Sequence, residues 1–213
     1  MRAERQTAGR GRSGRRWESG AGNLYCSTVV NLQPDDPAAH TLSLVAGLAV
    51  HDLLGMELGH TGFDRQQARW LKWPNDLLCN GAKIAGILCE RVKSTVIVGI
   101  GINVDRAPEV PDRSTTSIRQ QGGGSAIPAS QVLEHLVPLF ADRLEKWRSD
   151  PLPETLAAWE QRAHAPGTAL KVSDGDRFLE GSFAGLCSDG ALRLRLLDGS
   201  HRTIHAGDVE LEA

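Results

Sequence analysis

The dipeptide Asn80-Gly81 lies between two apolar segments, residues 77–79 and 83–89. Asn-Gly between apolar runs is the strongest short-range signal for a β-hairpin, because both residues tolerate the positive φ that a tight turn needs. Residues 96–104 follow as a near-continuous apolar run, which is typical of a central strand. The chain must therefore build a β-sheet that contains these segments.

Helix and strand signals lie on both sides of this region. The apolar spacing and the turn residues predict strands at residues 24–30 and 68–73, and helices at residues 38–58, 129–148 and 152–163, with Ser130 as an N-cap. Residues 1–23 and 105–127 are rich in glycine or proline and predict loops. Together these segments predict an α+β fold over residues 1–164, a mixed β-sheet with helices packed on it.

The pattern changes after Pro166. Short alternating segments are separated by Asp-Gly turns, and they predict strands near residues 169–172, 179–186, 191–197 and 202–205. Strands of this length with such turns are typical of a small antiparallel barrel. We place a domain boundary near residue 165, so that residues 165–213 form a separate C-terminal domain.

Charge is unevenly distributed along the chain. The 213 residues carry 24 Lys and Arg against 26 Asp and Glu, a net charge of −2, yet residues 1–16 hold six arginines and one acid. The hydrophobic fraction of 40% is enough to close a core. The apolar runs are short and interrupted, the N-terminus lacks a signal-peptide stretch, and the four cysteines show no CxxC spacing. We expect a soluble, reduced, cytoplasmic protein without a membrane span.

The arginine–glycine stretch at residues 5–17 is the most unusual part of the sequence. It contains a literal GxGxxG at Gly9, Gly11 and Gly14, but a dinucleotide-binding fingerprint needs a strand before it and a helix after it. We therefore reject that interpretation. Guanidinium groups and exposed backbone N–H groups on a flexible loop suit a polyanion. The alternative is a solvated basic arm or a non-specific nucleic-acid contact.

A second group of charges lies in residues 70–90. Lys72, Asp76 and Lys83 alternate there with dense apolar sequence, and charges held near a core usually pair. Beside an arginine loop, such a cluster would stabilise anionic oxygens developing at phosphorus. The alternative is an ordinary surface salt bridge on a hairpin.

The strand at residues 96–104 ends in Gly99-Ile-Gly101-Ile-Asn103. Two glycines allow another group to approach the backbone closely, and an asparagine amide can pair with a purine edge. Relief of crowding between packed elements explains the two glycines equally well.

Four motifs together resemble the bacterial biotin–protein ligases. They are Ala-Glu-Arg-Gln-Thr-Ala-Gly-Arg-Gly-Arg-Ser-Gly-Arg-Arg-Trp at residues 3–17, Lys-Trp-Pro-Asn-Asp-Leu at 72–77, Lys-Ile-Ala-Gly-Ile-Leu at 83–88 and Gly-Ile-Gly-Ile-Asn-Val at 99–104. They occur in the family's order, and the resemblance covers nearly the whole chain. It implies a biotin/lipoate ligase-like catalytic domain followed by a small SH3-like β-barrel.

The resemblance implies a two-step reaction with ATP, its Mg²⁺ and biotin. Biotin is activated to biotinyl-5′-AMP and then transferred to a lysine of a biotin carboxyl carrier protein. The helix-turn-helix of repressor-type members is not found in this sequence, so we expect no DNA binding, while a homodimer is compatible with the family. The family's first strand and its Ser-Thr-Asn-type segment, which contacts biotin, are also not found, so we expect weakened biotin binding.

The resemblance also assigns roles to individual residues. It implies biotin binding by Gln6, Arg10, Gly11, Arg12 and Lys83, nucleotide binding by Arg12, Trp17 and Asn103, and catalysis by Lys83, Arg10 and Asp76. Asp76 would orient Lys83 or help to hold Mg²⁺.

Two alternatives remain at this point. A lipoate–protein ligase of the same superfamily is disfavoured, because that family lacks the Gly-Arg-Gly-Arg loop. An RNA-binding module that uses the arginine arm is disfavoured because only Trp17 is available nearby for base stacking.

Overall fold

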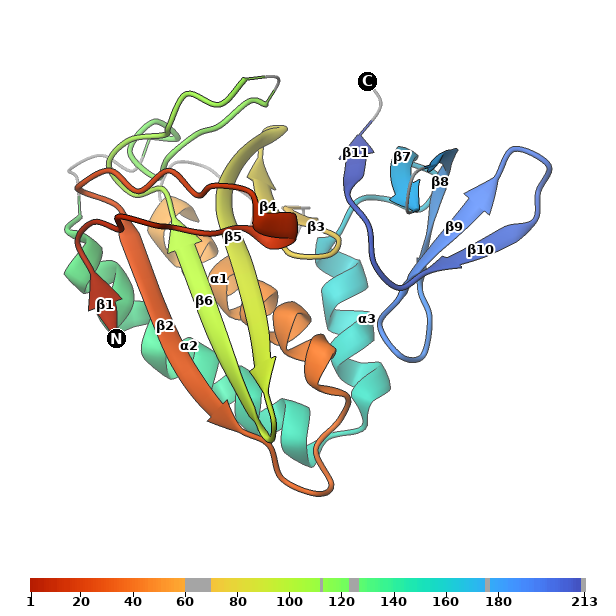
Figure 1. Ribbon diagram of the computed structural model, residues 1–213, viewed down its shortest axis with the longest axis horizontal. Helices are drawn as coiled ribbons and strands as arrows, with labels where there is room; N and C mark the ends of the chain where they lie inside the picture. Colours follow the sequence, from red (N-terminus) through yellow and green to blue (C-terminus); the bar gives the residue numbers. More distant parts are fainter. Residues whose placement is uncertain (60–69, 112, 123–126, 175–176, 212–213) are drawn as a thin grey trace.

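A computed structural model describes residues 1–59, 70–111, 113–122, 127–174 and 177–211. Its main sheet has six strands in the order β1-β2-β6-β5-β4-β3 (Figure 1). These strands are β1 (Arg2–Ala3), β2 (Leu24–Asn31), β3 (Leu71–Lys72), β4 (Asp76–Cys79), β5 (Ala82–Val92) and β6 (Thr95–Ile102). Neighbouring strands of this sheet run antiparallel. Parallel pairing in the described residues is confined to isolated bridges, Leu71 with Ala163 and Lys83 with Thr115.

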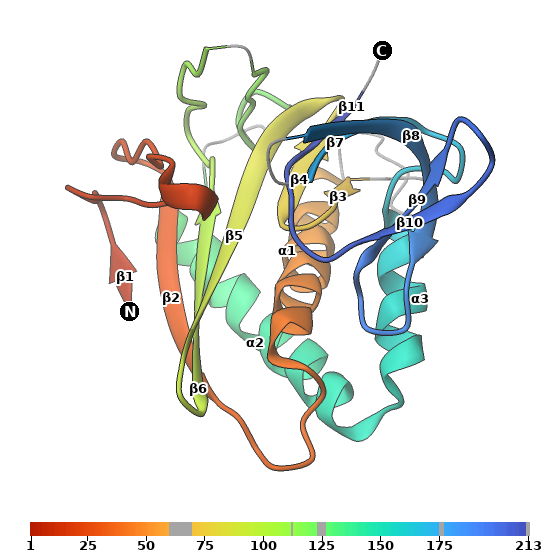
Figure 2. The ribbon, with the colours of Figure 1, turned by 45° about the vertical axis from the view of Figure 1, so that its right-hand side comes forward.

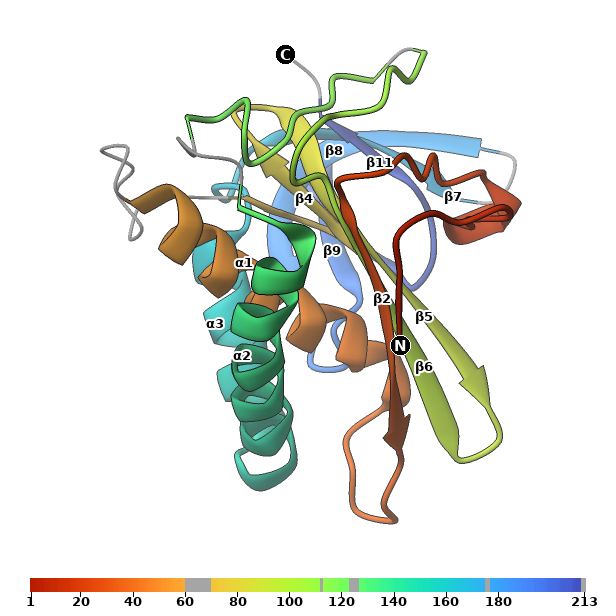
Figure 3. The same ribbon diagram turned by 90° about the vertical axis from the view of Figure 1, so that its left-hand side faces the viewer.

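Three helices cover one face of this sheet and leave the other face open (Figure 3). They are α1 (Leu42–Leu58), which follows a 3-10 turn at Ala39–Thr41, α2 (Ala129–Ser149) and α3 (Leu152–Arg162). Alternate residues of β6, such as Val96, Val98 and Ile100, are buried beneath the helices. The period-2 alternation of a strand therefore assigns the intervening residues, such as Gly99 and Gly101, to the open face.

Helix α1 is the core helix of the protein. Among the described residues, the stretch Ala39–Leu58 is long and apolar enough to cross a membrane by length and composition alone. However, 78% of its apolar window is buried inside the protein. These are the properties of a core helix, since α1 packs against both the sheet and the other helices.

The C-terminal region forms a second antiparallel sheet in the order β10-β9-β8-β7-β11 (Figure 2). Its strands are β7 (Ala169–Asp174), β8 (Arg177–Leu186), β9 (Leu192–Leu196), β10 (His201–Ile204) and β11 (Val209–Leu211). A buried apolar set that includes Val172, Phe183 and Leu194 fills its inner side. The α+β architecture with a small C-terminal β-domain of the SH3-like type is confirmed.

The local predictions can be compared with these elements. The hairpin turn is confirmed, with positive φ at Asn80 (51°) and Gly81 (78°). Ser130 is not the N-cap, because α2 begins at Ala129 and Pro128 occupies the N-cap position. Residues 68–69 of the strand expected at 68–73 lie outside the described residues, and strand β11 was not predicted.

Candidate active site

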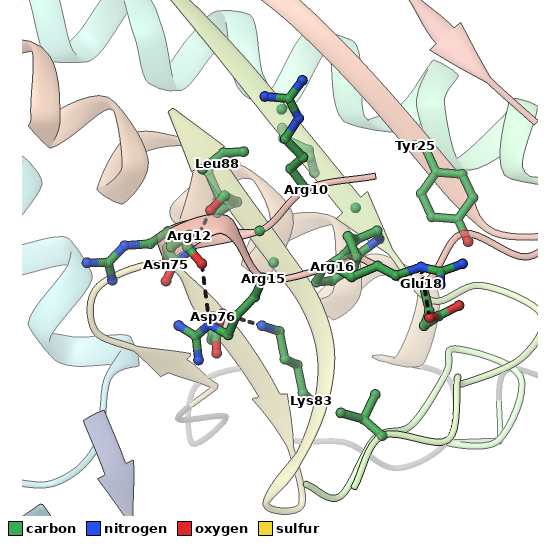
Figure 4. A pocket seen from close by; sticks show the side chains of 18 of the residues that line it. Arg10, Arg12, Arg15, Arg16, Glu18, Tyr25, Asn75, Asp76, Lys83 and Leu88 are labelled. Atoms are coloured by element: carbon green, nitrogen blue, oxygen red, sulfur yellow. Dashed lines mark hydrogen bonds and ion pairs between the residues drawn. The ribbon is translucent and has the colours of Figure 1, made fainter. Parts of the chain in front are cut away.

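A cavity of about 820 Å³ lies on the open face of the main sheet (Figure 4). Strands β2, β6 and β5 form its floor, and residues 6–18, the arginine loop, cross that face on the side away from the helices (Figure 3). Residues 108–111, Arg113, Thr115 and Asp208 complete the wall. The eight residues to which the family resemblance assigned roles all line this cavity: Gln6, Arg10, Gly11, Arg12, Trp17, Asp76, Lys83 and Asn103.

Two paired glycines form a seat for Trp17 on the cavity floor. Gly86 of β5 lies directly opposite Gly101 of β6. A Cβ atom at Gly86 would lie 2.8 Å from the indole ring, and one at Gly101 would lie 2.7 Å from it. The close approach expected at Gly101 is thus made by the protein's own tryptophan. The Nε1 of Trp17 is buried and has no hydrogen-bond partner in the described part of the chain.

Asp76 and two lysines form the charged centre of the cavity. The Nζ of Lys83 donates to Oδ1 of Asp76 at 2.6 Å, and the Nζ of Lys72 lies 4.0 Å from Oδ2. The hairpin turn between β4 and β5 brings Lys83 back beside Asp76. Burial lowers the pKa of Lys72, and the neighbouring Asp76 opposes that shift. The Nζ of Lys83 also lies 5.2 Å from the centroid of the Trp17 ring, within cation–π range.

The arginine loop is folded and reaches the C-terminal domain. The N–H of Trp17 donates to the carbonyl of Gly9 at 2.9 Å, and residues Arg12–Gly14 form a 3-10 turn. The Nη1 of Arg12 donates to the carbonyl of Gly207 at 3.2 Å, and Arg15 forms an ion pair with Asp208. Burial lowers the pKa of Arg12, while the carboxylates of Asp208 and Asp76 oppose that shift.

Arg10 behaves differently from its neighbours. Its side chain is exposed and points away from the Asp76–Lys83 pair (Figure 4). The structure therefore does not bring Arg10 to the two other residues that the sequence assigned to catalysis. Gln6 lies at the cavity edge, where its Oε1 accepts a hydrogen bond from the hydroxyl of Ser19 at 2.8 Å.

Asn103 is buried at the end of β6, with 2% of its surface exposed. Its Nδ2 donates to the carbonyl of Thr116 at 3.0 Å and to the carbonyl of Lys83 at 3.4 Å. Within the described residues its Oδ1 is buried and has no hydrogen-bond partner. Since buried acceptors are normally satisfied, this oxygen is a candidate to accept a hydrogen bond from a ligand.

The charges around the cavity favour an anionic ligand. Seven arginine and lysine side chains and five carboxylates line it, which leaves +2 (7 − 5). The cations nearest Asp76 and Asp208 are Arg12, Arg15, Lys72 and Lys83. Sequence reasoning missed Arg15 and Asp208. The two residues are 193 positions apart in the chain, and no local pattern connects them.

Asp76 does not fit a resident magnesium site. Its carboxylate faces two ammonium groups, whereas Mg²⁺ prefers oxygen ligands. The described part of the chain also contains no group of three His, Cys, Asp or Glu side chains placed to hold a metal ion. We therefore derive no step through a metal bound to Asp76.

Comparisons with known proteins agree with this geometry. The family described as Biotin/lipoate A/B protein ligase family matches residues 2–106, and the Biotin protein ligase C terminal domain matches residues 169–212. A biotin–[acetyl-CoA-carboxylase] ligase of Paracoccus denitrificans is 38% identical over 206 residues, covering 91% of this chain and 82% of that protein. The chain belongs to the biotin protein ligase family. A second such ligase, from Mycobacterium tuberculosis, is 36% identical, covering 97% of this chain and 76% of that protein.

Solved structures of this family have the same fold. The biotin protein ligase of Aquifex aeolicus in complex with biotin and ATP superimposes with a TM-score of 0.81 at 30% identity, covering 99% of this chain and 87% of that chain. A bifunctional ligase/repressor of Bacillus subtilis is 34% identical over 98% of this chain, and the match spans 65% of that protein. Membership therefore rests on both domains of the chain.

Proposed function

We propose that the chain is an ATP-dependent biotin–protein ligase. It activates biotin to biotinyl-5′-AMP and then transfers biotin to a lysine of a biotin carboxyl carrier protein. The observation that carries this proposal is the single cavity in which Lys83, Lys72, Arg12 and Arg15 surround a groove on the open face of the sheet. Family membership and the Aquifex aeolicus complex with biotin and ATP support it.

In the first step, a biotin carboxylate oxygen attacks the α-phosphorus of ATP. The new C–O–P anhydride forms, the bond to the β-phosphate oxygen breaks, and pyrophosphate leaves with the electron pair. Both reactants are anions, so the barrier falls when fixed cations neutralise them as they approach. Lys83 is the best placed cation, since Asp76 holds its ammonium group at 2.6 Å and its burial limits competition from water.

The other residues receive roles that match their contacts. Asp76 orients Lys83, and it is not assigned as a magnesium ligand. Asn103 presents its unpartnered Oδ1, which can accept a hydrogen bond from the amino group of adenine. Gln6, Gly11 and Arg12 lie where biotin and the phosphates would meet the arginine loop, while the proposed role of Arg10 requires its side chain to turn inward.

In the second step, a neutral lysine amine of the carrier attacks the acyl carbon of biotinyl-5′-AMP. An amide forms, AMP leaves with the electrons of the acyl–oxygen bond, and the amine loses a proton to solvent. The mixed anhydride reacts with water, so a folded loop over the cavity protects it until the carrier arrives. We place the reaction in the cytoplasm with magnesium bound to the substrate ATP and without DNA contact, and a homodimer is compatible with the family.

The two alternative functions receive less support. The relatives reported above are biotin ligases, and the C-terminal match is to a biotin protein ligase domain, which argues against lipoate as the substrate. An RNA-binding arm would need aromatic side chains for base stacking. Trp17, the aromatic residue beside these arginines, is packed over Gly86 and Gly101 instead.

Biotin-dependent exchange between ATP and labelled pyrophosphate tests the first step. The purified chain should catalyse exchange with biotin and not with lipoate. A carrier domain should then gain biotin, and the same carrier with its acceptor lysine replaced by arginine should gain none. Exchange with lipoate alone, or no exchange with either acid, would overturn the proposed function.

A further inference from the structure

Asn23 lies at the junction between the two segments that enclose the cavity. It is the last residue before β2, just after the arginine loop, and only 4% of its surface is exposed. Its Oδ1 accepts hydrogen bonds from three consecutive backbone N–H groups, those of Val104 at 3.0 Å, Asp105 at 3.1 Å and Arg106 at 3.3 Å. Its Nδ2 donates to the carbonyl of Arg106 at 2.8 Å. A single buried amide thus holds three residues of a distant segment.

These contacts continue the sheet beyond its last backbone pair. The ladder between β2 and β6 ends where Leu24 pairs with Ile102. Beyond that pair the two strands no longer pair through their backbones. The side chain of Asn23 instead accepts hydrogen bonds from the N–H groups of residues 104–106, which follow β6. Because buried N–H groups without an acceptor are costly, this side chain stabilises the path of residues 104–106.

A close backbone approach strengthens the same junction. Gly22 has a φ of +91°, and a Cβ atom there would lie 2.9 Å from the Cβ of Asp105. The carboxylate of Asp105 in turn accepts a hydrogen bond from Arg119 at 2.6 Å. Residues 22–23 and 104–106 therefore meet with no room for an intervening side chain, directly after Asn103, which lines the cavity.

The residue that this junction positions is Asn103. Its own N–H donates to the carbonyl of Ile84 at 2.9 Å, and its carbonyl accepts from Ile118 at 3.0 Å. Asn23 fixes the next peptide group, because it binds the N–H of Val104. Hydrogen bonds on both sides of Asn103 thus fix its backbone, and with it the direction of its Oδ1, which is buried without a partner in the described residues.

We propose that Asn23 is a positioning residue for the nucleotide, which acts by fixing residues 104–106 so that Oδ1 of Asn103 meets the amino group of the purine. This inference rests on the proposed function, since it takes ATP as the substrate. Asn23 touches no reacting atom. Its effect on activity passes through the geometry of Asn103 and the adjoining wall, and it belongs to ATP recognition rather than to biotin recognition.

Four variants, among them Asn103→Ala, and two nucleotides test this inference. Asn23→Ala removes all four hydrogen bonds, whereas Asn23→Asp keeps the three accepted bonds and loses the donated one. Asn31→Ala at the other end of β2 is the matched control, because Asn31 is exposed and its side chain accepts from the hydroxyl of Thr95 at 3.1 Å. The hydrogen bond from Arg148 goes to the backbone carbonyl of Asn31, which alanine keeps. Each variant is assayed by pyrophosphate exchange with ATP and with inosine triphosphate, which has an oxygen in place of the amino group.

We expect Asn23→Ala to raise the KM for ATP by about tenfold, since a misplaced acceptor loses about one hydrogen bond, while the KM for biotin changes by less than about twofold. The preference for ATP over inosine triphosphate should fall by a similar factor. Asn23→Asp should lie between Asn23→Ala and the unmodified chain, and Asn31→Ala should match the unmodified chain. Thermal unfolding of each variant identifies any loss of fold, and Asn23→Asp keeps the test available if Asn23→Ala does not fold.

An active Asn23→Ala variant with an unchanged KM for ATP and an unchanged nucleotide preference would overturn the inference. Equal increases in the KM values for ATP and biotin would also overturn it, because general loosening would then explain both. Asn103→Ala must lose the preference for ATP, and retention of that preference overturns the inference as well. Failure of the proposed function is a separate result, since the unmodified chain would then show no biotin-dependent exchange.

Discussion

His164 provides a test of the junction between the two domains. It lies between α3 and β7, and its Nε2 is buried without a hydrogen-bond partner in the described part of the chain. Burial lowers the pKa of His164 to about 4, and the positive charge of Lys72 acts in the same direction. The folded protein therefore holds this imidazole neutral at pH values where an exposed histidine would be protonated.

The sign and size of the pH effect follow from this difference. The unfolded chain binds a proton at His164 near pH 6.5, and the folded chain binds it only near pH 4. The contribution of His164 to the unfolding free energy is therefore fully present above about pH 6.5 and is lost as the pH falls toward 4. The full loss is about 3 kcal/mol at 1.36 kcal/mol per pKa unit, and about 2 kcal/mol of it is lost between pH 8 and pH 5.

Urea unfolding of the unmodified chain and of His164→Gln at pH 8 and pH 5 measures this effect. Glutamine does not titrate, so the unmodified chain should lose about 2 kcal/mol more than the variant between these two pH values. His201→Gln serves as the control, because His201 is exposed on β10 and its variant should follow the unmodified chain. If His164→Gln and the unmodified chain lose equal stability on acidification, the argument from burial is refuted.

Three further predictions concern the cavity. Lys83→Ala should lower biotin-dependent pyrophosphate exchange by about two to three decades at unchanged thermal stability, and near-normal exchange would remove Lys83 from catalysis. Asp208→Asn should raise the rate of amide hydrogen exchange in the arginine loop by about threefold and leave the rate in β2 unchanged. The effect is small because a half-exposed ion pair contributes under about 1 kcal/mol. Identical exchange in both proteins would show that this contact does not hold the loop. Gly101→Ala should lower the free energy of chemical unfolding by about 1–3 kcal/mol, since its Cβ would lie 2.7 Å from Trp17. Gly99→Ala, whose Cβ would have its nearest contact at 3.4 Å, should lower it less. Equal losses would contradict the packing of the indole ring on Gly101.

The parts of the fold that could be predicted from the sequence depend on local signals. Asn80-Gly81 fixes the hairpin because the turn needs positive φ at both residues, and the structure has it there. The apolar run at residues 96–104 predicted a central strand, and β6 pairs with β2 and β5 on its two sides. Strand β11 could not be predicted, because three residues are too few to show an alternating pattern. Its conformation depends on pairing with β7, which precedes it by more than thirty residues in the chain.

The site could be predicted only where a motif keeps its residues close in the chain. Asp76 and Lys83 are seven residues apart and meet across a turn, so their pairing could be expected from the sequence. Arg15 and Asp208 are separated by 193 residues, and Asn23 lies 81 residues from the first of its partners. No periodicity or spacing connects such positions, because tertiary packing alone brings them together. Asn23 and Asp208 were therefore missed, although each occupies a junction that shapes the cavity.

The contacts of the arginine loop explain how it can be held by the protein and still bind substrate. A guanidinium group has five N–H donors in a planar fork, and the contacts with Gly207 and Asp208 use only part of this capacity at Arg12 and Arg15. Donors therefore remain to bind phosphate oxygens while the loop stays attached to the C-terminal domain. A lysine offers three donors on one atom and lacks the fork that spans two acceptors, which makes arginine the better residue at both positions. The C-terminal domain thus takes part in the proposed site by holding Arg12 and Arg15, the cations that we propose for phosphate binding.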